Sequence, residues 1–123
     1  MMNLAAIAIG GAVGALLRFW VSSGIYYILG KEFPYGTLAV NILGSFLMGF
    51  LYILFLERIV SSELRAIVLI GLLGAFTTFS TFSIETMNLL LDGEQTKALL
   101  NIFLSVGLCL LATWMGMLLA RQI

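Results

Sequence analysis

Four long apolar runs, separated by short charged segments, constrain this chain more than any other feature. They cover Leu4–Leu29, Thr37–Leu56, Ala66–Leu91 and Ala98–Ala120. A helix of about 20 apolar residues spans the hydrocarbon core of a bilayer, and each run reaches that length. Hydrophobic residues make up 62% of the chain, well above the roughly 45–50% typical of soluble domains. We therefore predict an all-α membrane protein in which residues 1–123 form a single domain of four transmembrane helices.

The polar composition argues against several classes of function. The six basic and six acidic residues balance, and the chain has no basic tail or patch that would bind nucleic acid. Histidine is absent and Cys109 is the only cysteine, so neither an intrachain disulfide nor a His/Cys metal cluster can form. An intramembrane enzyme is disfavoured because the hydroxyl groups have no obvious general base. The N-terminal apolar run lacks a positively charged leader, and we expect it to remain in the mature protein.

Charge counting leaves the orientation in the membrane open. Four spans place both termini on one side, together with Arg58, Arg65 and Arg121, whereas Lys31 and Lys97 lie on the other side and Arg18, deep in the first span, is assigned to neither. Orientation normally follows an excess of Lys and Arg in cytoplasmic loops, and here the excess is small. Insertion in both orientations and a fixed orientation set by subtler features are equally compatible with these counts.

Small residues recur at intervals of about four on three of the spans. The positions are Gly10 and Gly14, then Gly44, Ser45 and Gly49, and then Ala112, Gly116 and Ala120. Small residues at this spacing let helix backbones approach closely in lipid. We interpret most of them as packing positions, either within a subunit or between subunits. Four helices enclose little room for a lined pathway, so a transport function would favour a homo-oligomer, most simply a dimer.

Polar residues also recur at intervals of four, which places them on single helix faces. The fourth span carries Asn101, Ser105, Cys109 and Thr113, and the second span carries Thr37, Asn41 and Ser45. Single hydroxyls often bond to their own helix backbone, so a functional polar track and separate backbone bonds remain equal alternatives for the fourth span. Asn41 has both donors and acceptors to satisfy, which favours a functional role over a structural hydrogen bond between helices.

The third span contains the stretch GAFTTFSTFS, which begins at Gly74. Gly71 and Gly74 weaken a helix, and the hydroxyls that follow compete for backbone hydrogen bonds. We predict a helix broken near its middle rather than a continuous one, because non-helical backbone at membrane depth commonly marks an ion or substrate site. Phe76, Phe79 and Phe82 lie within this run, and the positive edges of their rings suit contact with a small anion.

Two charged residues lie within the predicted spans, where ionisable side chains are functional candidates by default. Arg18 in the first span would either draw anions into a vestibule or reach a lipid headgroup. Glu85 lies about a turn beyond the FSTF run that ends at Phe82 in the third span. It would either gate a pathway or end a helix in water, and its position favours the gating role.

Three segments resemble the signature segments of the CrcB/Fluc family of small bacterial fluoride channels. They read GGAVGALLRF, GTLAVNILGSFLMG and GLLGAFTTFSTFSIE, and the resemblance spans most of the chain. It implies an antiparallel, dual-topology homodimer with two pores, located as a multi-pass protein in the bacterial inner (cell) membrane. It also implies passive and highly selective export of cytoplasmic fluoride, which lowers fluoride toxicity, and no enzymatic activity.

The resemblance also implies roles for individual residues on the fluoride pathway. Phe79 and Phe82 correspond to phenylalanines that present their ring edges to the ion, and Asn41 corresponds to a pore asparagine. Ser80 and Thr81 fall at the helix break. We therefore expect these five residues to line or shape the fluoride pathway.

Further residues match the family's polar track and its ion-binding positions. The track falls on Asn101, Ser105, Cys109 and Thr113. Asn101 stands where some members have tyrosine and Cys109 where serine is expected, and a thiol is a weaker hydrogen-bond donor than a hydroxyl. Glu85 matches a gating-region carboxylate, and Arg18 matches a vestibule arginine.

The resemblance further implies a structural sodium ion at the dimer interface. The backbone carbonyls of Gly74 and Thr77 match the positions that hold this ion, which is not transported. Sodium is therefore the one cofactor that we expect.

Two other classes of membrane protein compete with the channel interpretation. A proton-coupled exporter of the small multidrug resistance type also has about four spans and often dual topology. Its proton chemistry depends on a glutamate in the first span, where this chain carries Arg18, and here Glu85 lies in the third span. A non-transporting membrane subunit that scaffolds a larger complex would explain the glycines but not the aligned polar residues.

Overall fold

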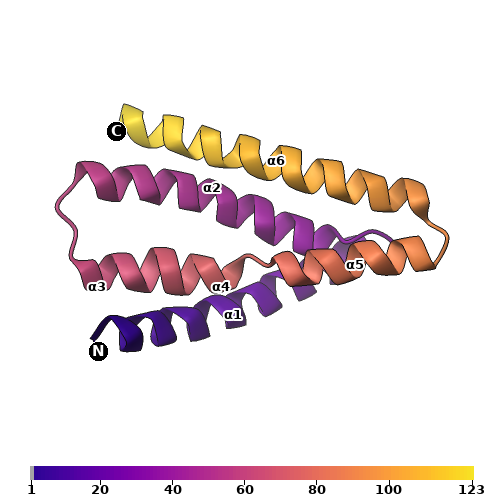
Figure 1. Cartoon of the computed structure of the whole chain (residues 1–123), viewed down its shortest axis with the longest axis horizontal. Helices are drawn as coiled ribbons and strands as arrows, with labels where there is room; N and C mark the ends of the chain where they lie inside the picture. Colours follow the sequence, from indigo (N-terminus) through magenta and orange to yellow (C-terminus); the bar gives the residue numbers. More distant parts are fainter. Residues whose placement is uncertain (1) are drawn as a thin grey trace.

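The computed structural model describes residues 2–123, and Met1 lies outside the described residues. Within this range the elements are α1 (Met2–Leu29), α2 (Tyr35–Glu57), α3 (Ser62–Arg65), the π-helical η1 (Ala66–Leu73), α4 (Gly74–Phe76), α5 (Phe79–Leu91) and α6 (Gln95–Gln122). Elements α3 to α5 follow one another along a single line (Figure 1) and form the third span. Four helical segments are long and apolar enough to cross a membrane, so the prediction of four spans is confirmed.

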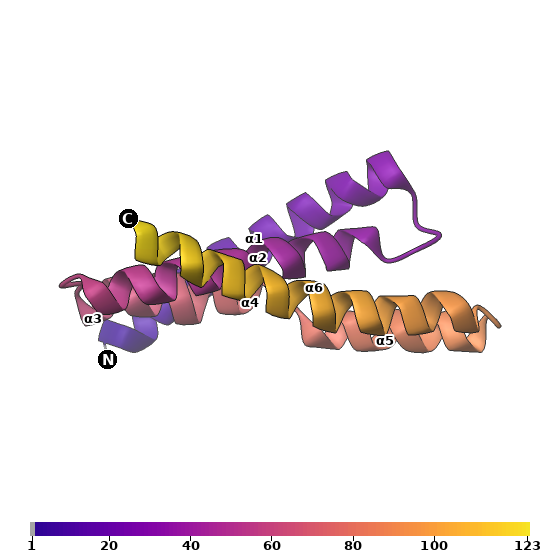
Figure 2. The same ribbon diagram turned by 90° about the horizontal axis from the view of Figure 1, so that it is seen from above.

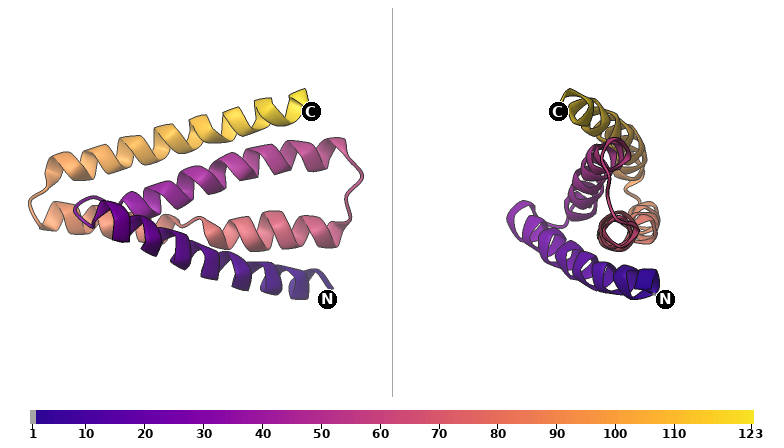
Figure 3. Two further views of the ribbon diagram at one scale, coloured as in Figure 1. Left: turned by 180° about the vertical axis from the view of Figure 1, so that it is seen from behind. Right: turned by 90° about the vertical axis from the view of Figure 1, so that its left-hand side faces the viewer.

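The helices form a bundle whose two ends differ. Both termini and the connection between α2 and α3 lie at one end (Figure 1). Seen end-on, the third span lies between α1 and the α2–α6 pair (Figure 3). At the other end, α1 and α2 together diverge from α5 and α6 (Figure 2). The polar residues described below lie on the elements that border this divergence.

Glycines let neighbouring helices touch backbone to backbone. A Cβ atom placed on Gly49 of α2 would overlap the carbonyl of Thr113, and one placed on Gly116 of α6 would overlap the carbonyl of Phe46. A Cβ on Gly10 of α1 would likewise overlap the backbone of η1. The interpretation of these three glycines as packing positions is confirmed within the subunit.

Replacing Gly116 by alanine is therefore expected to destabilise the bundle. The added methyl group would overlap the Phe46 carbonyl, and overpacking of this kind costs about 1–3 kcal/mol. The measurement is the thermal unfolding midpoint of the detergent-solubilised protein, which should fall by several degrees. Gly107→Ala is the matched control on the same helix, because no atom lies within 4 Å of its Cβ position. An equal loss of stability in both variants would contradict this packing argument.

Apolar side chains dominate the outside of the bundle, and polar ones are found inside it. Phe19, Trp20, Phe103 and Trp114 are each more than half exposed. The buried polar side chains are Thr37, Thr86, Asn101 and Ser105. This distribution reverses that of a soluble protein and is the one expected when lipid surrounds the helices.

Candidate functional site

The third span is interrupted between α4 and α5. Thr77 and Thr78 have extended backbone conformations, with ψ angles of 156° and 119°. The amide and hydroxyl of Thr77 both donate to the Leu73 carbonyl, at 3.2 and 3.1 Å, and this ends α4. The hydroxyl of Thr78 accepts a hydrogen bond from the Thr81 amide at 3.2 Å, as an N-cap residue does. Two consecutive threonines therefore end one helix and begin the next.

Asn41 on α2 pairs with the backbone of this interruption. Its side-chain nitrogen donates to the Thr78 carbonyl at 3.0 Å, and its side-chain oxygen accepts from the Thr78 amide at 2.8 Å. Thr78 lies outside both helices, and the side-chain amide of Asn41 supplies the donor and the acceptor that a helix would give to its backbone. The structural hydrogen bond between helices, considered above as an alternative for Asn41, is present. A side-chain amide has two N–H groups, so one N–H remains for a further acceptor.

Arg18 on α1 contacts α4 just before the interruption. Its Nε atom donates to the Ala75 carbonyl at 3.1 Å. The hydrogen bonds among the described residues leave the nearby carbonyls of Gly74 and Thr77 without a donor. Side chains from α1 and α2 therefore hold the end of α4 and the interruption, while the Gly74 and Thr77 carbonyl oxygens remain free to bind something else.

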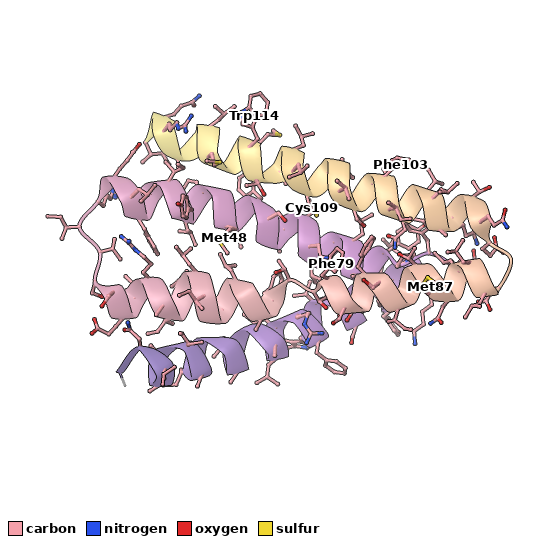
Figure 4. The ribbon with its side chains drawn as sticks, viewed as in Figure 1. Met48, Phe79, Met87, Phe103, Cys109 and Trp114 are labelled. Atoms are coloured by element: carbon pink, nitrogen blue, oxygen red, sulfur yellow. The ribbon has the colours of Figure 1, made fainter. Side chains whose placement is uncertain are left out.

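A pocket of about 410 Å³ lies beside the interruption. Six of the residues predicted for the pathway line it, namely Asn41, Phe79, Phe82, Ser105, Cys109 and Thr113. Its lining contains hydroxyl, amide, thiol and aromatic groups and no Asp, Glu, Lys or Arg. Figure 4 places Met48, Phe79 and Cys109 on α2, α5 and α6 around this region, whereas Phe103 and Trp114 point away from the bundle.

Three other predicted pathway residues do not line the pocket. Ser80 is exposed, and its hydroxyl lies 3.4 Å from that of Thr78. Thr81 accepts a hydrogen bond at its hydroxyl from the Thr78 hydroxyl, at 3.1 Å. Asn101 is only 1% exposed. Ser80 and Thr81 therefore shape the start of α5, and Asn101 lies beneath the pocket surface.

The polar face of α6 is connected to α5 by a chain of hydrogen bonds. The Ser105 hydroxyl donates to the side-chain oxygen of Asn101 at 3.3 Å, and the Asn101 side-chain nitrogen donates to the Thr86 hydroxyl at 2.9 Å. Thr86 in turn donates to the Phe82 carbonyl at 2.7 Å. Sequence reasoning gave Thr86 no role, although its spacing of four from Phe82 places both on one face of α5.

The other end of the α6 polar face contacts α2. The Thr113 hydroxyl lies 2.9 Å from the carbonyl of Cys109 on its own helix and 3.2 Å from that of Ser45 on α2. Ser45 and Met48 also line the pocket and were not predicted as site residues. For Ser45 the signal was its spacing of four from Asn41, which places both on one helix face. For Met48, an apolar residue in an apolar span, the sequence offered no comparable signal.

The interruption separates the three phenylalanines of the third span. Phe76 is 5% exposed, and its ring packs against Gly44. Phe79 and Phe82 begin the next helix and line the pocket, with ring centroids 5.3 Å apart and planes tilted by 47°. In a regular helix their spacing of three would place all three rings roughly on one side, but the extended residues between Phe76 and Phe79 turn the chain and separate Phe76 from the other two.

Glu85 belongs to a second cluster, one turn beyond Phe82 on α5. The Tyr26 hydroxyl donates to its Oε2 atom at 2.6 Å, and Tyr26 also lies 3.3 Å from the Thr37 hydroxyl. A second pocket, of about 370 Å³, is lined by Tyr26, Glu85 and Lys31 among others. Within residues 2–123, Arg18 and Glu85 form no ion pair with each other.

These features define a class of protein. The chain is a polytopic α-helical membrane protein with an uncharged, hydrogen-bonding pocket between its spans. The family model described as "CrcB-like protein, Camphor Resistance (CrcB)" matches residues 5–117. The chain belongs to the CrcB family, which confirms the resemblance seen in its three signature segments and sets aside the multidrug exporter.

Curated relatives match over almost the whole chain. A protein of Methylococcus capsulatus is 57% identical over 123 residues, which are 99% of this chain and 54% of that protein. A protein of Magnetococcus marinus is 52% identical, covering 99% of this chain and all of its own length. A protein of Geobacter sulfurreducens is 50% identical over the full length of both. Each is named "Fluoride-specific ion channel FluC". The chain thus spans about half of the Methylococcus protein and the whole of the other two.

Proposed function

We propose that this protein is a fluoride-selective ion channel that lets cytoplasmic fluoride leave the cell passively and so lowers its toxicity. Its location would be the inner (cell) membrane of a bacterium. The observation that carries the proposal is the pocket beside the interrupted third span, lined by neutral hydrogen-bond donors and two phenylalanine rings. The names of its full-length relatives support the same ion.

Fluoride is small and strongly hydrated, so a pathway must replace its water. The idealised cost of moving a carboxylate-sized ion into a medium of low dielectric is of order 20 kcal/mol. The free N–H of Asn41 and the pocket's hydroxyls would supply hydrogen bonds, and the edges of Phe79 and Phe82 carry partial positive charge. No lining residue bears a full positive charge. An anion would therefore bind without being trapped, which conduction requires.

The test is ion efflux from liposomes that contain the purified protein. We expect fast loss of fluoride, followed with a fluoride electrode, and negligible loss of chloride under the same gradient. Rapid chloride loss would contradict fluoride selectivity. Absence of fluoride loss from correctly assembled protein would overturn the proposed function.

The working unit that we propose is an antiparallel homodimer with two pores. The exposure of Phe79 supports the presence of a partner chain at this surface. Phe79 lines the pocket, and yet 76% of its surface area is exposed in the single chain. A second copy would cover this ring and complete the pathway. The near balance of Lys and Arg between the two sides of the bundle is compatible with insertion in both orientations.

Cysteine labelling tests the orientation. In a Cys109→Ser background, a cysteine added at either terminus should react with a membrane-impermeant maleimide from both faces of the membrane. About half of the molecules should react from outside intact cells, since opposite insertion of two copies is the basis of this dimer. Labelling from one face only would exclude dual topology.

We also propose that the free carbonyls of Gly74 and Thr77 contribute to a structural sodium site between the two copies. Hard cations prefer oxygen ligands, and these two oxygens have no hydrogen-bond donor among the described residues. Two oxygens are too few for a cation of this kind, so a second copy would supply more. The dimer should melt at a lower temperature when sodium is replaced by a large organic cation, and an unchanged midpoint would count against the site.

Glu85 and Arg18 would serve the two ends of the pathway. Glu85 lies one turn from Phe82, which lines the first pocket, and itself lines the second. This position suits a carboxylate that controls passage between the two. Arg18 uses its Nε atom on the Ala75 carbonyl, and its two terminal nitrogens would attract anions toward the vestibule. Asn101, which is buried with Thr86, would support the polar track from behind.

A further inference from the structure

Tyr26 connects three of the four spans through one hydroxyl group. It lies on α1, donates to Glu85 Oε2 on α5 at 2.6 Å, and accepts from the Thr37 amide on α2 at 3.4 Å. Its hydroxyl is also 3.3 Å from the hydroxyl of Thr37. A hydrogen bond to a carboxylate is shorter and stronger than one between neutral groups. The bond to Glu85 is therefore the strongest of these contacts.

The ring of Tyr26 is held in place by its surroundings. A Cβ atom on Gly36, in the first turn of α2, would overlap this ring, so the ring lies directly against the α2 backbone. The Tyr26 carbonyl accepts from the amide of Gly30 at 2.8 Å, where a positive φ of 89° ends α1. The neighbouring Tyr27, in contrast, is 91% exposed. The position of the Tyr26 hydroxyl is therefore set by α1 and α2 together.

This hydrogen bond lies at the second pocket, about one helical turn from residues that line the first. Asn41 and Phe82 line the first pocket, and Thr37 and Glu85 lie about one turn further along the same two helices, α2 and α5. Tyr26 and Glu85 line the second pocket. At this end of the bundle the α1–α2 pair diverges from α5 and α6 (Figure 2). The Tyr26–Glu85 bond therefore joins the two diverging pairs beside the pathway.

Tyr26 also provides the only hydrogen bond that the described residues make to the Glu85 carboxylate. Oε2 accepts from Tyr26, and the buried Oε1 atom has no hydrogen-bond partner. An ionised carboxylate beside an anion pathway repels the anion, and the repulsion grows as the distance between the two charges shortens. The direction in which Glu85 is held therefore matters for passage, and one phenol determines it.

We propose that Tyr26 is a positioning residue that holds the Glu85 carboxylate toward α1 and α2 and thereby sets the rate of fluoride passage. This inference rests on the proposed function. Without the phenol hydroxyl, the Glu85 side chain is free to turn toward Phe82 and the first pocket. Its negative charge would then oppose an approaching fluoride ion.

The test compares Tyr26→Phe with Tyr27→Phe in the liposome efflux assay. Both variants remove one phenol hydroxyl from neighbouring positions, and only the first removes the bond to Glu85. We expect Tyr26→Phe to slow fluoride efflux about fivefold, in line with the loss of a hydrogen bond to a charged group, and Tyr27→Phe to leave it unchanged. Equal rates in the two variants would overturn the inference.

A second variant separates positioning from a general loss of structure. Adding Glu85→Gln to Tyr26→Phe removes the charge that the freed side chain carries, so the double variant should conduct faster than Tyr26→Phe alone. A structural role would instead make the double variant equal to or slower than the single one, and that result would overturn the inference. Efflux by the unmodified protein is measured in parallel. Its absence would overturn the proposed function, whereas normal wild-type efflux with an unaffected Tyr26→Phe variant would overturn this inference alone.

Discussion

Asn41→Asp is expected to reduce fluoride efflux by at least about 100-fold. The substitution would place a negative charge inside the pocket that Asn41 lines. Two unit charges 4 Å apart repel by about 4 kcal/mol at an effective dielectric of 20, and each 1.4 kcal/mol corresponds to a factor of about ten in rate. The measurement is the initial rate of fluoride efflux from liposomes at equal protein density.

The same substitution would also remove a structural contact, and the experiment must separate the two effects. Aspartate has no N–H group to donate to the Thr78 carbonyl, which Asn41 contacts at 3.0 Å. Asn41→Ala loses that contact without adding a charge, so it should conduct better than Asn41→Asp if charge dominates. Asn3→Asp makes the same chemical change at an exposed position on α1 and should leave efflux unchanged. A near-normal rate for Asn41→Asp would remove Asn41 from the pathway.

The spans were predictable because their signal is local. An apolar run of the required length forms a helix in lipid, since every backbone polar group must be satisfied within the segment. Gly74 and the hydroxyls of GAFTTFSTFS are also a local signal, and the extended backbone of Thr77 and Thr78 lies within that stretch. The π-helical geometry of η1 gave no such signal, because apart from Gly71 its sequence AIVLIGLL has the pattern of an ordinary apolar helix.

The partners of the polar residues could not be predicted, because they depend on how the helices cross. Intervals of four identify a helix face, but they do not say what that face meets. Thr37, Asn41 and Ser45 lie on one face of α2, and each has a different partner, namely Tyr26, Thr78 and Thr113. Tyr26 itself gave no signal in the sequence, since nothing local distinguishes it from Tyr27.

Asn101 on the fourth span is a second residue whose spacing predicted its helix face but not its hydrogen-bond partner. Its spacing placed it with Ser105, Cys109 and Thr113, and the structure keeps it on that face. It is nevertheless buried against Thr86 on α5, where that element approaches α6, and it does not line the pocket. The Asn101 amide forms a hydrogen bond with a neighbouring helix because an unpaired polar group in an apolar environment costs several kcal/mol.

Phe82→Ile is expected to slow fluoride efflux by about thirtyfold while the protein remains assembled. Isoleucine is aliphatic and has no positive ring edge to offer an anion. The converse attraction, between a cation and the face of a ring, is worth about 2 kcal/mol when the ion is desolvated, and we expect the edge contact with fluoride to be similar. Efflux rate and gel-filtration profile are measured on the same preparation.

Phe103→Ile is the matched control for Phe82→Ile. Phe103 is 71% exposed and points away from the bundle on α6 (Figure 4), so its replacement should not alter efflux. Phe82→Met then separates the ring edge from simple filling of space, because methionine is flexible and fills irregular gaps but also lacks a ring. If methionine restored efflux, Phe82 would serve only to pack the pocket wall beside Phe79. If Phe82→Met slowed efflux as much as Phe82→Ile, the pathway would depend on the aromatic ring itself. The protein, which has no positive charge in this pocket, would then bind its anion through neutral donors and ring edges.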